Sequence, residues 1–366
     1  MITLGQPVAP DLAILHQLIG AITASGRWTN GGATVRELEH VLSQDLGSAC
    51  ALTTASGTTA LTLALLACDL PRGGEVITSP LTFPATVHAI EAAGLVPVFA
   101  GVDPVTLNLA ADAACLAIGP RTVAILPVHL FGIAADPEFD DIAAAAGLAI
   151  VYDAAHAYGL PGISARGSAA AYSLHATKLM HTGEGGLVTT SDPEFAERLS
   201  LARNFGLVGD RALTPGTNGK LSELSAALGL AVHAGLAREI QSRRATRDAY
   251  QGVVEASERV RPHAPGCPRA LVMEAIRCDP DDQEQLLADL AQRGIAGRRF
   301  PALTAENQRY SRVPLIGGER ADLDRVAASV LAIPLHGRVT QQAIDAVAHA
   351  VRAAPMLTQD ASLAPI

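Results

Sequence analysis

"RTVAILPVHLFGIAADPEFDDIAAAAGLAIVYDAAH", residues 121–156, contains two short apolar runs on either side of an acidic, alanine-rich segment. The runs 121–132 and 148–156 predict buried strands, and the segment 136–147 predicts a helix. A strand, a helix and a second strand in this order indicate a βαβ unit with two parallel strands. Both strands are continuously apolar, as expected where helices cover both faces of a sheet.

The same alternation continues on both sides of this unit. Further strands are predicted at 74–80, 95–103 and 185–192, and a helix is predicted at 82–94. These elements predict an α/β fold built on a mainly parallel sheet.

The pattern changes after residue 192. Segments 193–206 and 221–257 are predicted to be helical, the second being one long helical segment. A strand is expected within 264–279 and a helix at 281–294, with acidic residues early and Arg293 late. We therefore expect a large domain of residues 1–240 and a small domain of residues 241–366, the last residues (355–366) being frayed.

Composition limits the class of protein. Of the 366 residues, 49% are hydrophobic and 17% charged, which is typical of a globular protein with a large core. The net charge of -9 and the lack of a basic run exclude nucleic acid as an expected partner. An anionic ligand would therefore need local donors.

Other sequence features bear on the compartment. The five cysteines form no CxxC pair, which favours a reducing cytosol, and no metal site is expected. The first residues do not resemble a signal peptide, and there is no apolar run of about 18 residues or more that would predict a membrane span. We expect a cytoplasmic protein.

"TTASGTTALTLALLAC", residues 53–68, predicts a helix that begins near Gly57. Gly57 allows the backbone to approach a ligand closely, and Thr58 and Thr59 offer hydroxyls beside the free N–H groups of a helix N-terminus. This pattern predicts an anion site. The alternative is a helix with an ordinary cap and no ligand.

Asp153 lies at the carboxyl end of the predicted strand 148–156, and His156 follows three residues later. Ligands of open α/β sheets bind outside this end of the strands. A carboxylate there needs a cationic or hydrogen-bonding partner. The alternative is that Asp153 caps the segment that follows.

Lys178 lies 25 residues beyond Asp153, in "YSLHATKLMHTGEGG", residues 172–186. Ser173 precedes the lysine, and a glycine-rich turn follows it. A lysine whose pKa is depressed can form a Schiff base, whereas the alternative is a solvated surface lysine. His175 and His181 flank the lysine and have no role that the pattern assigns.

Together, a phosphate-type helix start, an aspartate and a lysine meet the needs of pyridoxal 5'-phosphate. Several segments of the chain resemble segments of the DegT/DnrJ/EryC1/StrS sugar aminotransferases and occur in the same order as in that family. The segments that carry the resemblance are "SGTTALTLAL", "SPLTFPATVHAIEAAG", "PVHLFGIAADPEFDDIA", "VYDAAHAYG", "YSLHATKLMHTGEGGLVTT", "TNGKLSELSAALG" and "LAIPLHGRVT". The resemblance implies the aspartate-aminotransferase-like fold type I, in which a mainly parallel, seven-stranded-type sheet with helices on both faces is joined to a smaller α+β C-terminal domain.

The resemblance also implies roles for individual residues. Lys178 would form the imine with the cofactor and move the proton, and Asp153 would pair with the pyridine nitrogen. Phe83 would stack on the ring, although a core aromatic is an equal alternative. The remaining cofactor contacts would come from Gly57, Thr58, His156 and Ser173, and from Asn218 of the neighbouring subunit of a homodimer with shared active sites.

The implied reaction moves an amino group from an amino acid, L-glutamate being the expected donor, to a nucleotide-linked keto-deoxysugar. The segments look most similar to branches that act at C4 of a 4-keto-6-deoxyhexose, and the product would feed polysaccharide or O-antigen biosynthesis. Alternatives are C3 amination of a 3-keto sugar, amination of a cyclitol ketone, other pyridoxal-phosphate chemistry, and a cofactor-binding protein without turnover. A related branch has histidine in place of the lysine and deoxygenates its substrate, so Lys178 favours transamination.

Two further points concern substrate contacts. Gly219 and Lys220 follow Asn218 where the family has an aromatic residue and an arginine, so the contact between subunits is expected to differ. Arg298, Arg299 and His336 are candidates for the sugar side of the site, with surface positions as the alternative.

Overall fold

The computed structural model describes residues 1–299 and 310–352, so the tail expected to fray at 355–366 lies outside the described residues. An eight-stranded sheet in the order β1-β7-β6-β5-β4-β2-β3-β13 forms its largest layer. Its strands are β1 (Cys50–Thr54), β2 (Glu75–Thr78), β3 (Val96–Ala100), β4 (Thr122–Leu126), β5 (Ala149–Asp153), β6 (Ala169–Ser173), β7 (Gly186–Thr190) and β13 (Leu315–Ile316).

Most of this sheet is parallel. The pairs from β6 through β5, β4, β2 and β3 to β13 are parallel, whereas β7 is antiparallel to both β6 and β1. The predicted α/β class with a mainly parallel sheet is therefore confirmed. Seven strands come from residues 50–190, and the short β13 returns from the C-terminal part of the chain to pair with β3.

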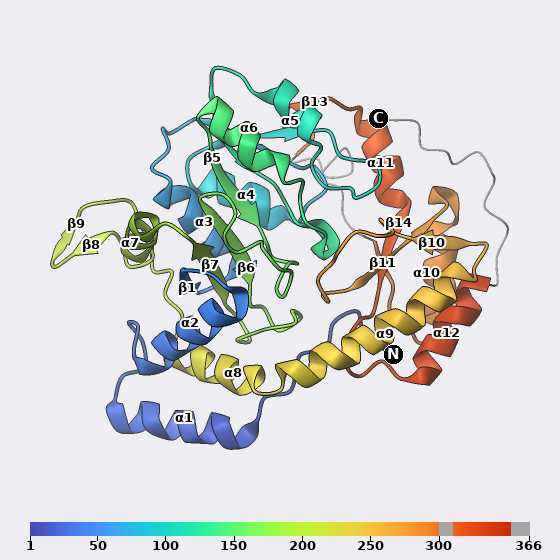
Figure 1. Cartoon of the computed structure of the whole chain (residues 1–366), viewed down its shortest axis with the longest axis horizontal. Helices are drawn as coiled ribbons and strands as arrows, with labels where there is room; N and C mark the ends of the chain where they lie inside the picture. Colours follow the sequence, from blue (N-terminus) through green and yellow to red (C-terminus); the bar gives the residue numbers. More distant parts are fainter. Residues whose placement is uncertain (300–309, 353–366) are drawn as a thin grey trace.

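Helices cover both faces of the large sheet (Figure 1). The helices of this region are α1 (Leu12–Ser25), α2 (Ala33–Leu46), α3 (Gly57–Ala67), α4 (Pro84–Ala92), α5 (Ala111–Ala117), α6 (Glu138–Ala146), α7 (Pro193–Ala202), α8 (Glu223–His233) and α9 (Leu236–Glu255), with a 3₁₀ turn at Leu130–Gly132. Of these, α1 packs against α8, and α9 runs to α12 (Gln341–Arg352) and β10 (Val260–Pro262). Two apolar clusters fill the space between sheet and helices, one of them centred on α3.

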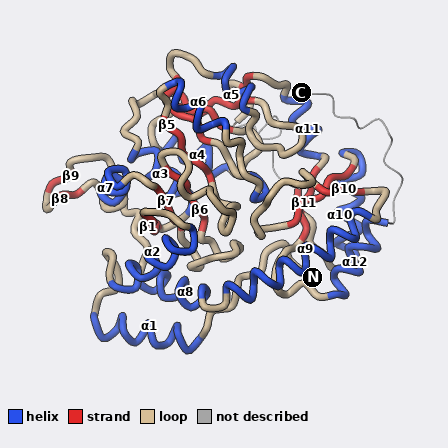
Figure 2. The backbone as a smooth tube through the Cα atoms, in the orientation of Figure 1, coloured by secondary structure: helices blue, strands red, loops and turns tan. Residues whose placement is uncertain are grey.

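A second, four-stranded sheet in the order β10-β11-β14-β12 lies in the C-terminal region. Its elements are β10 (Val260–Pro262), β11 (Glu274–Cys278), β12 (Arg298–Arg299) and β14 (Val330–Ile333), with α10 (Gln283–Gln292), α11 (Arg320–Ala328), α12 (Gln341–Arg352) and a 3₁₀ turn at Pro280–Asp282. Figure 2 shows these strands apart from the large sheet, with α9 running between the two regions. The predicted division at residue 240 falls inside α9 and stays a prediction.

One element differs from the sequence prediction. Segment 221–257 is not a single long helix, because the chain breaks at Ala234 and Gly235 into α8 and α9. Glycine weakens a helix interior, and Gly235 begins α9 without a side-chain cap. The break turns α9 away from α8 toward the C-terminal sheet (Figure 1).

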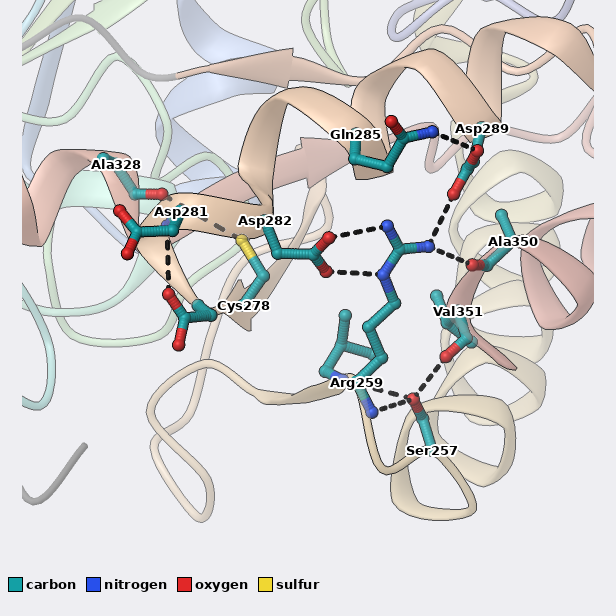
Figure 3. A network of polar contacts seen from close by, with 12 residues as sticks. Ser257, Arg259, Cys278, Asp281, Asp282, Gln285, Asp289, Ala328, Ala350 and Val351 are labelled. Atoms are coloured by element: carbon teal, nitrogen blue, oxygen red, sulfur yellow. Dashed lines mark hydrogen bonds and ion pairs between the residues drawn. The ribbon is translucent and has the colours of Figure 1, made fainter. Parts of the chain in front are cut away.

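Two buried ionic groups hold distant elements together. Glu223, only 1% exposed, accepts hydrogen bonds from the backbone N–H groups of Gly32, Thr34 and Val35 at 2.6, 3.0 and 3.3 Å, and so caps α2 from the first turn of α8. In the C-terminal region, Arg259 donates to the carboxylates of Asp282 and Asp289 and to the Ala350 carbonyl (Figure 3). These contacts join β10, α10 and α12.

A small hairpin, β8 (Leu207–Val208) and β9 (Arg211–Ala212), extends from the body of the molecule (Figure 1). Among residues 1–299 and 310–352, no helix combines the length and the apolar character that a membrane crossing requires.

Candidate active site

A cavity of about 430 Å³ opens where the carboxyl ends of β5 and β6 meet the N-terminus of α3. This is the edge at which open α/β sheets bind ligands. The C-terminal sheet contributes a second wall through Val272, Met273, Arg298 and Ala332. The cavity therefore lies between the two sheets.

Asp153 ends β5 and is 4% exposed at the floor of this cavity. Its Oδ2 accepts a hydrogen bond from the Thr86 hydroxyl at 2.8 Å, and its Oδ1 accepts one from the Ala155 N–H at 3.0 Å. Burial raises the pKa of Asp153, and these two donors and the Lys178 charge lower it again. The carboxyl also bonds the start of the following segment, as the capping alternative expected, and it faces the cavity as well.

Lys178 lies in the loop that follows β6 and lines the same cavity. The loop is closed by a hydrogen bond from the Lys178 N–H to the His175 carbonyl at 2.8 Å. Burial lowers the pKa of Lys178 to about 8; Asp153 opposes this shift, and Arg298 adds to it. Lys178 is therefore not a solvated surface lysine, and a substantial fraction of its amine is neutral near physiological pH.

The N-terminus of α3 faces the end of β6. Ser56 caps the helix by accepting from the Thr59 N–H at 3.1 Å, and Gly57 and Thr58 line the cavity. A Cβ on Gly57 would lie 2.9 Å from the Cβ of Ser173, which is closer than real side chains pack. Glycine thus allows the N-terminus of α3 to approach Ser173 closely. The backbone N–H groups of the helix and the serine hydroxyl could then bind the same anion.

Phe83 precedes α4 and lines the cavity with 54% of its surface exposed, which excludes the core alternative. His156 lines the cavity as well. Burial holds the pKa of His156 well below its usual value, with a further contribution from the Lys178 and Arg298 charges, so the ring is neutral.

Asn218 is exposed and does not line the cavity of its own chain within the described residues. It forms an isolated bridge with Asn204. The Lys220 ammonium donates to the Asn204 side chain at 2.9 Å and lies 4.8 Å from the centre of the Phe205 ring. The predicted contact of Asn218 with a neighbouring subunit stays a prediction.

Of the three candidates for the sugar side of the site, only one lines the cavity within the described residues. Arg298 lines the cavity, and across residues 1–299 and 310–352 it is the one arginine that does so. Arg299, on the same short strand, pairs with Glu284. His336 is 1% exposed and bonds the Thr3 carbonyl, so it is a structural residue in this chain.

The two histidines that flank Lys178 occupy different environments. His175 lines the cavity, bonds the Thr177 hydroxyl at 2.9 Å and lies 3.6 Å from Glu184. His181 is buried at 3% exposure, and its Nε2 bonds the Val8 carbonyl at 2.9 Å.

Several lining residues escaped the sequence argument. They are Leu4, Gly5, Val272, Met273, Ala332 and Glu184. Most are apolar or small and come from both ends of the chain, so no local motif distinguishes them. Glu184 lies inside the quoted "GEGG", but the pattern indicated only a turn there.

This set of residues fits pyridoxal phosphate on the geometry alone. A lysine with a lowered pKa, a buried carboxylate, a helix N-terminus beside a serine and an exposed aromatic ring converge on one cavity. Within the described residues, no group of three or more His, Cys, Asp and Glu side chains could hold a metal ion.

The family model of the DegT/DnrJ/EryC1/StrS aminotransferases matches residues 14–352. The chain belongs to this family. The resemblance noted in the sequence is thereby confirmed over nearly the whole chain.

Two named relatives of this DegT/DnrJ/EryC1/StrS chain are described with a TDP-linked sugar. It is 36% identical over 231 residues to the dTDP-4-amino-4,6-dideoxy-D-glucose transaminase of Shigella dysenteriae, a match that covers 62% of each chain. The match thus spans less than two thirds of that curated relative. The fold is similar to that of DesI, solved in the presence of its TDP-sugar product (TM-score 0.88, 31% identity, 96% of this chain and 92% of that chain).

A second solved structure is DesV of S. venezuelae in complex with a ketimine intermediate. Its TM-score is 0.85 with 29% identity, covering 93% of this chain and 94% of that chain. Family and fold therefore agree with the fold type I architecture expected from the sequence.

Proposed function

We propose that this protein is a pyridoxal-phosphate-dependent aminotransferase that moves an amino group from an amino acid to a nucleotide-linked keto-sugar. The observation that carries the proposal is that Lys178, with its pKa lowered to about 8, shares one cavity with the buried Asp153 and the N-terminus of α3. Each of these groups matches one part of the cofactor: its aldehyde, its ring nitrogen and its phosphate.

The cofactor supplies an aldehyde for the lysine and a ring that accepts electrons when bound. Asp153 holds a negative charge at the ring nitrogen, with Thr86 and Ala155 fixing its orientation. Gly57, Thr58 and Ser173 would hold the phosphate of the bound cofactor, Phe83 would pack on its ring, and His156 would face its 3-oxygen.

With the cofactor bound, the Lys178 amine would act as the base that takes a proton from the carbon on one side of the transferred nitrogen and delivers it to the carbon on the other side. A base for this step works best when its pKa is near the working pH, and burial of Lys178 moves its pKa in that direction. Val272 and Met273 add apolar surface to the cavity that holds this amine.

For the substrate, we propose C4 of an NDP-4-keto-6-deoxyhexose, with L-glutamate as donor. The name of the Shigella relative supports a 4-amino-4,6-dideoxy sugar, and the DesI structure supports a TDP-linked one. Arg298 is the group that would meet an anionic part of the acceptor, its nucleotide phosphate.

We also propose a homodimer in the cytoplasm, with Asn218 reaching the phosphate of the neighbouring site. Its exposure on this chain leaves it available for that contact. Exposed apolar residues nearby, including Trp28 at 46% and Leu224 at 43%, fit an interface.

The decisive experiment offers the purified protein a panel of nucleotide-linked 3-keto and 4-keto sugars with L-glutamate and identifies the products by mass spectrometry. The expected product is the 4-amino sugar together with 2-oxoglutarate. A 3-amino product or an aminated cyclitol would replace the proposed acceptor while keeping the reaction.

A second measurement tests the lysine. Borohydride reduction should fix the cofactor to Lys178, and Lys178→Ala should lose both this label and the visible absorbance. Retention of both in the variant would show that another residue carries the cofactor.

A further inference from the structure

The first residues of the chain cross the cavity from one sheet to the other. Residues 2–8, here called the N-terminal strap, begin beside the C-terminal region (Figure 1) and end at Val8, which contacts His181 of the lysine loop. Ile2 pairs with Ile295: its N–H donates to the Gly294 carbonyl at 2.7 Å, and its carbonyl accepts from the Ala296 N–H at 2.9 Å. Its far end, Val8, is buried in the core of the large sheet.

Two histidines hold the strap, one from each side. His336, which follows β14, bonds the Thr3 carbonyl at 3.0 Å, and His181, which follows Lys178, bonds the Val8 carbonyl at 2.9 Å. In each ring Nδ1 accepts a backbone N–H two residues further on, from Arg338 and from Gly183. A carbonyl can only accept, so Nε2 must carry the hydrogen in both rings.

Burial allows both histidines to hold the strap carbonyls. Burial lowers the pKa of His181 and of His336, which keeps each ring neutral, with one donor and one acceptor. The two contacts are therefore the same interaction repeated at the two ends of the strap.

Between these two contacts the strap forms part of the cavity wall. Leu4 and Gly5 line the cavity, and Leu4 packs with the apolar cluster that includes Val272 and Met273. At Gly5 the backbone lies directly on the lysine loop, since an added Cβ would be 3.2 Å from the Cβ of Thr177, the residue before Lys178.

We propose that the N-terminal strap sets the separation between the lysine loop and the wall of the C-terminal sheet, and so determines which amino acceptor fits, with His181 and His336 as the positioning residues. The strap spans both walls and contacts the loop of the reactive lysine. A nucleotide-linked sugar is large enough to touch both walls, whereas an amino-acid donor needs only the region near Lys178. The acceptor part of this inference rests on the proposed function.

The test compares His181→Phe and His336→Phe with His181→Gln, in the protein loaded with pyridoxal phosphate. Glutamine can place an N–H where Nε2 donates, whereas phenylalanine cannot. Hydrogen exchange of the peptide covering residues 1–10 should speed up in both phenylalanine variants and return toward the original rate in His181→Gln.

Kinetics give the functional measurement. Each phenylalanine variant should raise KM for the keto-sugar by roughly fivefold to tenfold, the effect of losing one buried hydrogen bond, while the single-turnover reaction with glutamate stays unchanged. His233→Phe is the matched control, because His233 bonds Asp45 and does not touch the strap. It should change neither the exchange rate nor this KM.

The outcomes separate this inference from the proposed function. Faster exchange without a change in acceptor KM, or unchanged exchange in both phenylalanine variants, would overturn the role of the strap. If the original protein aminates no keto-sugar at all, the proposed function fails, and the exchange data still decide whether the two histidines hold the strap.

Discussion

A lysine amine and a carboxylate buried in one cavity influence each other's protonation. Burial favours the neutral form of both Lys178 and Asp153, and their mutual attraction favours the charged form of both. For the lysine the burial effect is larger, and its pKa falls to about 8. The protein thus supplies a nucleophilic amine through burial.

This balance predicts how the cofactor-free protein takes up pyridoxal phosphate. Only the neutral amine attacks an aldehyde, so the rate of cofactor uptake should rise with pH and level off above a midpoint near pH 8. The measurement is the rate at which visible absorbance appears between pH 6 and pH 10, a range that spans roughly two units on either side of the midpoint. Pyridoxal without its phosphate is the control and should give the same midpoint.

An unperturbed lysine would behave differently. The rate would then keep increasing toward 10.5, the ordinary pKa of the side chain, and that result would contradict the effect of burial.

Single residues also show what local sequence can reveal. Asp153 and Gly57 were predictable because they lie at the end of a predicted strand and at the start of a predicted helix. Lys178 and Ser173 lie outside every predicted strand and helix, and their roles followed from their combination with these two residues and from the family resemblance. Leu4 and Met273 were not, because apolar residues at opposite ends of the chain carry no local signal and meet only through the fold. His181 and His336 were noticed, but their roles depend on the carbonyls of the strap.

At the scale of elements, α3 and β6 meet where a ligand phosphate would bind. Their approach depends on the missing side chain of Gly57. The sequence predicted α3 and a glycine at its start for a close approach to a ligand, but it did not predict β6. Local patterns could not show that Ser173 is the neighbour of Gly57, because that contact joins segments more than a hundred residues apart, and only the family resemblance grouped the two residues.

Gly57→Ala should therefore weaken cofactor binding more than it weakens the fold. The added methyl group would push the helix end away from Ser173, and overpacking of this kind costs about 1–3 kcal/mol. The dissociation constant of pyridoxal phosphate, measured by absorbance titration, should rise about tenfold or more. Urea unfolding of the cofactor-free protein measures how much the substitution lowers the free energy of unfolding.

Gly252→Ala is the control for this prediction. Gly252 is an exposed position in α9, and an added Cβ there would meet nothing within 4 Å. The free energy of unfolding of this variant should rise by about 0.5–1 kcal/mol, and its affinity for the cofactor should be unchanged. Equal affinity in both variants would mean that α3 does not receive the phosphate.

Other elements show the limits of periodicity. The helical pattern of 221–257 is continuous, and only tertiary contacts determine that the chain turns at Gly235. The β13 strand was missed for a similar reason, since two residues give no pattern and their pairing with β3 comes from the return of the chain.

For the whole molecule, the proposed shared active sites make a quantitative prediction. Lys178→Ala and Asn218→Ala should each reduce activity, because each removes a group that one site needs. When the two variants are unfolded together and refolded, half of the dimers contain one subunit of each kind. In each mixed dimer, one of the two sites has both Lys178 and Asn218 intact. Activity should therefore return to about a quarter of the original. The measurement is the rate of sugar amination after refolding, with each variant refolded alone as the control. No recovery from the mixture, with dimers present by light scattering, would place Asn218 outside the neighbouring site.

The Glu223 cap links parts of the chain that are made at different times. Its carboxylate bonds the Gly32 N–H across 191 residues of sequence. At a synthesis rate of about 5–20 residues per second, the first turn of α2 waits roughly 10–40 s for its cap. The antiparallel pairing of β1 with β7 imposes a similar delay, because Cys50 meets Thr190. During translation the N-terminal third of this protein therefore lacks part of its stabilising contacts, and its folding is completed only when α8 leaves the ribosome.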